Sequence, residues 1–157
     1  MMGPECRGCK GPYSGVCVMS TTRKPEIDAR EKLRAAGLRP TRQRVALAGL
    51  LFRHGHRHVS AESLHEEAEK AGFGVSLATV YNTLHQFTEA GMLQQVVVDP
   101  GRFYFDTNQD DHQHFYDEDR SELIDIPSGT ITIDGVPTPP KGASVERVDV
   151  IVRIKRA

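Results

Sequence analysis

Hydrophobic residues recur with helical spacing through the first part of the chain, and the period then changes to that of strands. The first helix is expected over residues 26–36, where Gly37 ends it. A second helix is expected from an N-cap at Thr41 to about Phe52, because a Thr side chain can accept a hydrogen bond from a free amide of the first turn. The apolar residues of this second segment fall on one face, as in a helix that packs on a core.

The third and fourth helices are predicted from one repeated arrangement of start and stop signals. Ser60 and Ser76 are the expected N-caps, and each lies between a preceding Val and an apolar residue at the fourth helical position, which is the hydrophobic-staple pattern. Gly72 and Gly91 are the expected stops. A short Gly-containing turn over residues 72–75 would join the two helices, as in a helix-turn-helix. The predicted buried face of the fourth helix consists of Leu77, Val80, Leu84 and Phe87.

Beyond residue 92 the pattern favours short strands. Residues 93–98 and 102–106 flank the turn-forming sequence Asp99-Pro-Gly101, so a β-hairpin is expected directly after the fourth helix. Three more strands are expected over residues 122–126, 130–133 and 145–155. The last of these places Val148, Val150, Val152 and Ile154 on one face, which suggests burial against a sheet or a second subunit.

Helices followed by a hairpin are the order of a winged helix-turn-helix. We therefore predict an α+β fold, in which a winged helix-turn-helix DNA-binding domain (residues 23–106) precedes a small α/β domain for dimerisation and for metal or haem sensing (residues 107–157). Residues 1–22 lack periodicity and are expected to be a disordered extension. An ordinary helical bundle with a polar outer face is the alternative, and it explains the ordered caps, staples, turn and hairpin less well.

Composition narrows the class of protein. The chain has 157 residues with 38% hydrophobic and 26% charged residues, so a packed core is expected. No apolar run approaches the roughly 20 residues that span a bilayer, and residues 1–18 lack the apolar centre of a secretory signal. All three cysteines precede residue 18, which does not favour a disulfide-stabilised secreted protein. We expect a cytoplasmic protein without a membrane partner.

The net charge of −1 conceals two halves of opposite sign. Between Arg23 and Arg57 there are ten basic and three acidic residues, whereas between Asp99 and Asp125 there are nine acidic and two basic residues. A basic half suits a polyanion, and an acidic half that contains histidines suits a cation. Charge alone also allows two solvated faces without any partner.

The predicted surface of the fourth helix carries groups that can contact duplex DNA. Small polar and amide side chains on its exposed face can reach base edges, and a Tyr hydroxyl at its edge can contact a phosphate or thymine. Arginines at the start of the second helix are placed to hold backbone phosphates. The candidate DNA-binding residues are Arg39, Arg42, Arg44, Ser76, Thr79, Tyr81 and Asn82.

Two histidines and nearby carboxylates form a candidate metal site. His112 and His114 are two residues apart and would project from one face of a strand. Asp106 and Asp125 lie on neighbouring predicted strands, and His58 could reach them from the DNA-binding domain. Imidazoles combined with carboxylates suit Fe²⁺, Mn²⁺ or Zn²⁺. The spacing also fits solvated residues that bind nothing.

Several motifs resemble those of the ferric uptake regulator superfamily. They are His58-Val-Ser-Ala-Glu62, Ser76-Leu-Ala-Thr-Val-Tyr-Asn-Thr-Leu84 and Leu38-Arg-Pro-Thr-Arg-Gln-Arg44, and the resemblance covers about residues 27–126. The tail Arg147-Val-Asp-Val-Ile-Val-Arg153 resembles one branch, the iron response regulator of alpha-proteobacteria. The resemblance implies a homodimeric transcription regulator of iron or haem homeostasis, not an enzyme, that binds A/T-rich inverted repeats.

The resemblance also implies a ligand set. The superfamily's inter-domain metal site corresponds to His58, Asp106, His114 and Asp125, and the branch's haem-linked histidines correspond to His112 and His114. Gln113 and Arg147 stand where a carboxylate and a histidine are common, so a second regulatory metal site is expected to be absent. The structural zinc site is also expected to be missing, because no C-x-x-C pair follows residue 114.

Other functions remain open at this level. Within the superfamily, the alternatives are a peroxide sensor whose bound Fe²⁺ oxidises a ligand histidine and a regulator that responds to manganese or zinc. A metal-dependent hydrolase is disfavoured, because the chain has no H-E-x-x-H motif, no nucleophile paired with a base and no Gly-rich phosphate loop. A protein-interaction module would show no salt-dependent binding to DNA.

Overall fold

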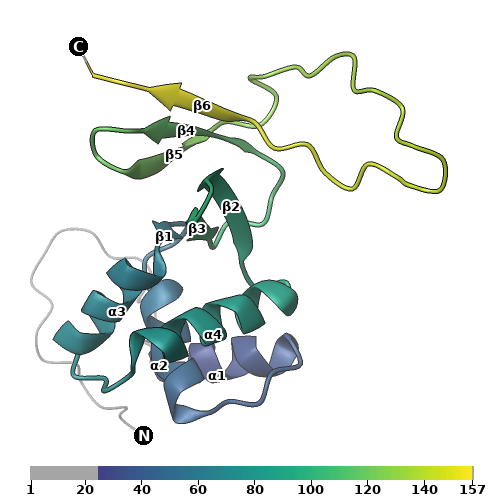
Figure 1. Cartoon of the computed structure of the whole chain (residues 1–157). Helices are drawn as coiled ribbons and strands as arrows, with labels where there is room; N and C mark the ends of the chain where they lie inside the picture. Colours follow the sequence, from purple (N-terminus) through teal and green to yellow (C-terminus); the bar gives the residue numbers. More distant parts are fainter. Residues whose placement is uncertain (1–24, 157) are drawn as a thin grey trace, which may run out of the picture.

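The computed structural model describes residues 25–156, with side chains from residue 28 onward, so the predicted extension over residues 1–22 lies outside the described residues. Figure 1 shows a layer of helices, then a first small sheet, then a second sheet on the far side of the first. The first sheet therefore lies between the helices and the second sheet, and residues from both sheets can meet at their boundary.

The helical layer contains four helices, and the last three start directly after their predicted N-caps. They are α1 (Pro25–Ala35), α2 (Arg42–Leu51), α3 (Ala61–Lys70) and α4 (Leu77–Glu89). The side chains of Thr41, Ser60 and Ser76 accept hydrogen bonds from the third amide of the following helix, at 3.1–3.3 Å. Gly72 and Gly91, with φ of 76° and 68°, follow α3 and α4 as predicted stops, because glycine adopts positive φ without a steric penalty.

Buried residues of all four helices and of the first sheet form one core. Leu33 comes from α1, Leu51 from α2, Leu64 from α3 and Leu84 from α4, and each side chain is fully buried. The prediction for α4 was wrong at one position, because Leu77 is 36% exposed whereas Thr83 is buried. Leu77 is the first residue of the helix and solvent reaches it there. Thr83 can be buried because its hydroxyl donates to the Thr79 carbonyl at 2.8 Å.

The first sheet contains the predicted hairpin. Strands β2 (Gln94–Asp99) and β3 (Arg102–Asp106) pair antiparallel, and β1 (His58–Val59) pairs with the other edge of β3, giving the order β1-β3-β2. Asp99 pairs with Arg102 across the turn, where Gly101 has a φ of 81°. The two residues of β1 immediately precede helix α3, so this strand links the sheet to the helical layer.

The second sheet contains three strands, the first of which was not among the predicted strands. It consists of β4 (Gln113–Asp117), β5 (Glu122–Ile126) and β6 (Ile151–Ile154), in the order β5-β4-β6. Strand β4 is antiparallel to β5 and parallel to β6. Buried Val96 and Val98 of β2 form a common apolar cluster with Tyr116 of β4 and Leu123 of β5, so the two sheets pack on each other.

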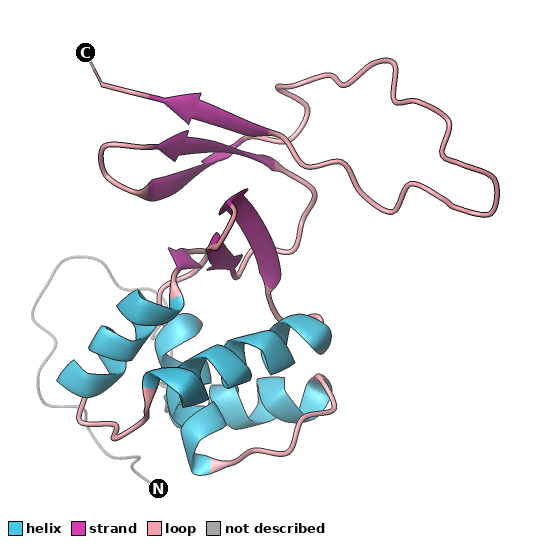
Figure 2. Ribbon diagram, in the orientation of Figure 1, coloured by secondary structure: helices cyan, strands magenta, loops and turns pink. Residues whose placement is uncertain are grey.

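Two strand predictions were wrong. Residues 130–133 form no strand, and only Ile151–Ile154 of the predicted strand over residues 145–155 pairs with a neighbour. Residues 127–150 instead form the long loop between β5 and β6 (Figure 2). Pro137, Pro139 and Pro140 interrupt the segment, because proline lacks the amide hydrogen that a ladder requires. The outer edges of β5 and β6 have no strand partner within the described residues. Within residues 25–156, no helix is long and apolar enough to cross a membrane.

Candidate metal centre

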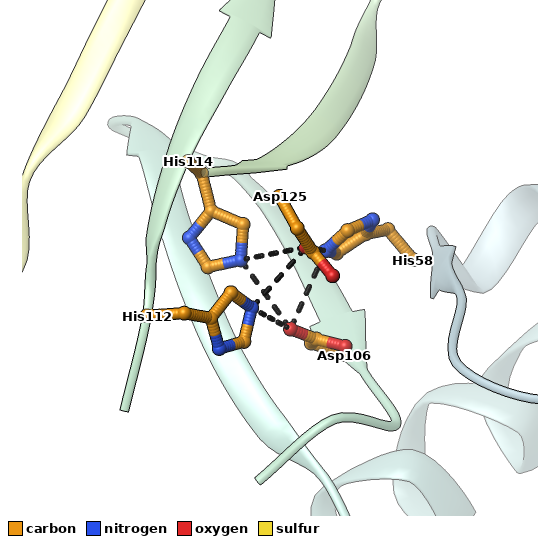
Figure 3. A group of neighbouring side chains, drawn as sticks. All are labelled: His58, Asp106, His112, His114 and Asp125. Atoms are coloured by element: carbon orange, nitrogen blue, oxygen red, sulfur yellow. Dashed lines mark hydrogen bonds and ion pairs between the residues drawn. The ribbon is translucent and has the colours of Figure 1, made fainter. Parts of the chain in front are cut away.

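Five side chains from both sheets converge at the boundary between them: His58, Asp106, His112, His114 and Asp125 (Figure 3). One ligand atom from each lies within 4.8 Å of the others. His58 and Asp106 are register partners in β1 and β3, and His114 and Asp125 are register partners in β4 and β5. Each sheet therefore contributes one His–Asp pair. His112, directly before β4, completes the cluster.

The two carboxylates face the three imidazoles. Asp106 Oδ2 lies 3.3 Å from His58 Nε2, 3.0 Å from His112 Nε2 and 3.3 Å from His114 Nε2. Asp125 Oδ1 lies 2.8, 3.2 and 3.7 Å from the same three nitrogens, in that order. Each imidazole therefore directs its Nε2 atom toward the space between two carboxylate oxygens, which is the arrangement expected of a coordination site rather than of separate ion pairs.

Hydrogen bonds at the rear of the cluster orient its ligands. His112 Nδ1 lies 2.6 Å from the Asp110 carbonyl, which can only accept, so Nδ1 carries the hydrogen. In the neutral ring this leaves the Nε2 lone pair directed into the cluster. The backbone amide of Asn108 donates to Asp106 Oδ1 at 2.7 Å, which leaves Oδ2 directed at the imidazoles. The Nε2 atoms of His58 and His112 are buried without a hydrogen-bond partner within the described residues, as expected of atoms placed for a cation.

Burial and charge determine the protonation of the cluster. Burial alone would raise the pKa of Asp106, but the hydrogen bond with His114, the adjacent His58 imidazole and the hydrogen bond from the Asn108 amide outweigh it and hold that pKa below its ordinary value. Burial alone would lower the pKa of His112, but its hydrogen bond to Asp110 and the charges of Asp125 and Asp106 raise that pKa. Asp106 is therefore ionised at neutral pH, and a proton on His112 would compete with a metal ion.

The donor set fits a divalent transition metal. Three imidazole nitrogens and two carboxylate oxygens suit Fe²⁺, Mn²⁺ and Zn²⁺, whereas Mg²⁺ and Ca²⁺ prefer oxygen ligands alone. Asp106 is fully buried, while the side chain of Asp125 is 39% exposed and leaves one side of the cluster open to solvent. An ion bound here would connect the first sheet to the second.

All four predicted metal ligands lie in this cluster, and the structure adds a fifth residue. The spacing had placed His112 beside His114 in the candidate metal site, whereas the family resemblance assigned His112 only to haem; its Nε2 lies as close to the carboxylates as that of His114. The i, i+2 spacing with His114 contained the signal, because such residues project from the same face of an extended segment. The predicted haem site shares these two histidines, and both rings are buried among the other residues of the cluster.

The predicted DNA-binding residues lie in the helical layer, just before or within α2 and α4, and outside the metal cluster. Arg39, Arg42, Ser76 and Asn82 are exposed, and Arg44, Thr79 and Tyr81 are partly buried. The Ser76 and Thr79 side chains also contact each other, with 2.9 Å between their hydroxyl oxygens.

Two of these residues make contacts that sequence reasoning missed. The Arg44 guanidinium donates to the Gln86 side chain at 2.8 Å and to the Arg39 carbonyl at 2.9 Å, which connects α2 to α4. The Tyr81 hydroxyl donates to the Glu62 carboxylate of α3. This hydrogen bond raises the pKa of Tyr81 and lowers that of Glu62. The partners in the Arg44–Gln86 and Tyr81–Glu62 contacts are far apart in the sequence, so no local sequence pattern predicts these contacts.

Residues 35–136 match the ferric uptake regulator family. The ferric uptake regulation protein of Pseudomonas fluorescens is 36% identical over 101 residues, which are 64% of this chain and 82% of that protein. The protein of the same name from Escherichia coli K12 is 32% identical over 105 residues, which are 66% of this chain and 71% of that protein.

Solved structures share the fold. The ferric uptake regulator of Pseudomonas aeruginosa with manganese superposes with a TM-score of 0.59 at 26% identity, covering 82% of this chain and 97% of that one. The Vibrio cholerae ferric uptake regulator gives a TM-score of 0.65 at 24% identity, covering 81% and 98% of the two chains.

Proposed function

This chain belongs to the ferric uptake regulator family, and we propose that it is a homodimeric, cytoplasmic transcription regulator whose binding to A/T-rich inverted repeats depends on a divalent cation. In this proposal residues 23–106 form a winged helix-turn-helix domain that binds DNA, and residues 107–157 form the dimerisation and sensing domain. Members of the family are transcription regulators rather than enzymes, and this membership argues against the metal-dependent hydrolase considered from the sequence.

The observation that carries the proposal is the origin of the five ligands. His58 and Asp106 belong to the first sheet, which continues directly into α3, whereas His114 and Asp125 belong to the second sheet. A cation bound to both pairs would restrict the angle between helix α4 and the second sheet. In a dimer, that angle determines the distance between two copies of α4, and hence whether both reach successive major grooves.

We infer that Fe²⁺ or Mn²⁺ is the regulatory ion and that His112 is a fifth ligand beside His58, Asp106, His114 and Asp125. Structural Zn²⁺ sites are almost always four-coordinate, whereas five donors are available here. The P. aeruginosa relative was solved with manganese and the Francisella tularensis ferric uptake regulator with iron. On this basis the regulated process is iron or manganese homeostasis.

Haem sensing through His112 and His114 stays a prediction with less support. Both imidazoles direct Nε2 at Asp106 and Asp125, so haem iron could bind either one only after that side chain had left the cluster. A haem titration followed in the Soret region, with and without saturating Mn²⁺, tests this point. Haem binding that His112→Ala abolishes would support it.

The DNA-binding surface is assigned to Arg39, Arg42, Arg44, Ser76, Thr79, Tyr81 and Asn82. Their position agrees with phosphate contacts from the start of α2 and base contacts from α4. The direct test measures the affinity for an A/T-rich inverted repeat across a salt series, with Mn²⁺ or with a chelator. A negative log–log slope and a metal-dependent affinity are expected, whereas a flat slope would refute DNA binding as the function.

A variant pair connects this test to the cluster. His114→Ala should abolish the metal dependence of DNA affinity, whereas His65→Ala, which changes a histidine of α3 outside the cluster, should retain it. A metal response unchanged in His114→Ala would refute the cluster as the regulatory site. For the peroxide-sensing alternative, mass spectrometry of the Fe²⁺-loaded protein after peroxide would find an added oxygen atom on His58, His112 or His114.

A further inference from the structure

The β2–β3 hairpin is attached to the second sheet at the end remote from the candidate metal centre. Arg153 of β6 donates to the Asp99 carboxylate at 2.6 Å and to the Val98 carbonyl, both at the end of β2. The same guanidinium lies 5.7 Å from the centre of the Tyr116 ring, and 3.5 Å from the Glu118 carboxylate. One side chain of the second sheet thus binds the hairpin through a backbone carbonyl and a carboxylate.

The hairpin makes two further polar contacts with the second sheet. Arg102 donates to the Tyr116 hydroxyl at 2.7 Å, and the Tyr104 hydroxyl donates to the Ser121 carbonyl at 2.7 Å. Tyr116 is only 1% exposed, because it also lies in the apolar cluster between the sheets. The hairpin face that carries buried Val96 and Val98 therefore packs on the second sheet, while Arg102 lies at its exposed margin.

The charge of the hairpin does not suit a nucleic-acid surface. Residues 94–106 contain one basic residue, Arg102, and two acidic residues, Asp99 and Asp106. The start of α2, by contrast, carries Arg39, Arg42 and Arg44. Because phosphate binding requires positive charge, the hairpin would contribute little to the affinity for DNA, and its only cation is directed at Tyr116.

We propose that Arg153 is a positioning residue that holds the hairpin on the second sheet, so that the hairpin contacts the C-terminal domain and not the phosphates of DNA. Strand β3 is then fixed at both ends, at Asp106 by the candidate metal centre and near Arg102 by the Arg153 contacts. Two separated points of attachment restrict rotation about either one. Arg153 would thereby pre-set the orientation of α4 for binding two half-sites.

The test compares DNA with two half-sites and DNA with one, at saturating Mn²⁺, and it rests on the proposed DNA-binding function. Arg153→Ala should weaken binding to the full inverted repeat by about tenfold, the scale of one hydrogen bond to a charged group. Binding to a single half-site should stay within about twofold, because the α4 surface itself is unchanged. Lys155→Ala is the matched control, since Lys155 follows β6 and pairs with Glu118 at 3.2 Å.

Asp99→Asn tests the same contact from the hairpin side without altering β6, and so without altering any subunit contact that β6 makes. It should lower full-site affinity in the same direction as Arg153→Ala, and the double variant should be no weaker than Arg153→Ala alone, because both remove one interaction. Arg153→Lys should recover part of the loss. Sedimentation of each variant at the assay concentration establishes that it is still a dimer.

Four results would overturn the proposal. The first is additive losses in the double variant, and the second is an equal loss on full and single half-sites. The third is a salt dependence that becomes shallower by about one in Arg102→Ala, since that is the signature of a lost phosphate contact. An increase in full-site affinity in Arg153→Ala would likewise contradict it, because the contact would then oppose DNA binding. Loss of salt-dependent DNA binding by the unaltered protein would refute the proposed function instead.

Discussion

Asp106→Asn isolates the contribution of the buried carboxylate to metal binding. Asp106 is fully buried, and its Oδ2 atom faces the Nε2 atoms of all three histidines at 3.0–3.3 Å. Asn has nearly the same shape, and its carbonyl oxygen can keep the hydrogen bond from the Asn108 amide that Asp106 Oδ1 accepts. The substitution therefore removes one anionic ligand while it preserves the packing.

The size of the effect follows from linkage between metal binding and folding. At a Mn²⁺ concentration 100 times the dissociation constant, the ion stabilises the folded protein by about 2.7 kcal/mol. Changing a residue that merely supports a ligand weakens metal binding roughly 10–100-fold, and we expect at least the upper end for a direct ligand. With an affinity about 100-fold weaker and the same Mn²⁺ concentration, the ion would stabilise the folded Asp106→Asn variant by only about 0.4 kcal/mol. For a chain of this length, the melting-temperature shift would decrease from about 5–10 °C to about 1 °C.

Thermal unfolding with Mn²⁺ and with a chelator measures both quantities on the same samples. Asp111→Asn is the matched control, because Asp111 is an exposed neighbour in sequence that lies outside the cluster. It should keep the full Mn²⁺-induced shift. If Asp106→Asn also kept that shift, Asp106 would not be a ligand and the five-residue centre would be refuted.

Three further predictions follow from burial, charge and exposure. The first concerns pH: the raised pKa of His112 gives stability that is fully present below the unfolded pKa and is lost as the pH rises through the folded pKa, so the protein in a chelator should lose stability above about pH 6.5. Mn²⁺ affinity should rise over the same interval, since the ion displaces the proton, and calorimetry in buffers of different ionisation enthalpy would detect the released protons. Second, Asn82→Ala should cost about 1–3 kcal/mol in operator affinity without changing the melting temperature, because Asn82 is an exposed amide on α4; an unchanged affinity would exclude it from base contact. Third, Leu51→Ala should lower the free energy of unfolding by about 2–5 kcal/mol in urea titrations, because Leu51 is fully buried in the helical core.

Sequence reasoning succeeded where the determinants of structure are local. Thr41, Ser60 and Ser76 each satisfy an amide three residues ahead, so the signal and its effect lie within one helical turn. The turn at Gly101 is local in the same way, and the hairpin formed as predicted. Burial of an individual side chain is less local. Leu77 has the helical phase of the buried Leu84, but its exposure depends on where the core ends, which periodicity does not report.

The second sheet was predicted less well because a strand needs a partner. Residues 130–133 and 145–150 have the alternation of strands, yet they do not pair, although the outer edges of β5 and β6 have no strand partner within the described residues. Only Ile151–Ile154 pairs, in parallel register with β4. Alternation therefore reports the capacity of a segment to pair, whereas packing in the whole fold decides whether it does so.

The sequence predicted the residue types of the candidate site, but it did not predict which residues would make up the whole cluster. His58 and Asp125 are 67 positions apart, so residue types alone allowed their meeting, and the family resemblance was needed to assign both to one site. Assigning His112 required the position of its backbone just before β4 and the hydrogen bond from its Nδ1 to Asp110. The contact between Arg153 and Asp99 spans 54 positions and leaves no periodic trace in the sequence.

The pairing of ligands within each sheet explains why an ion here would act on orientation. His58 and Asp106 are already neighbours in one antiparallel ladder, and His114 and Asp125 in another, so little ordering within either sheet would accompany binding. The free energy of coordination would instead act on the relative position of the two sheets. An attachment at Asp106 alone would still allow the first sheet to rotate relative to the second about that point. The Arg153 contacts lie near the other end of β3, about 13 Å away along a five-residue strand, where they oppose that rotation. Loss of either attachment should therefore leave the helical domain and the second sheet folded, while it changes how well two copies of α4 fit two half-sites.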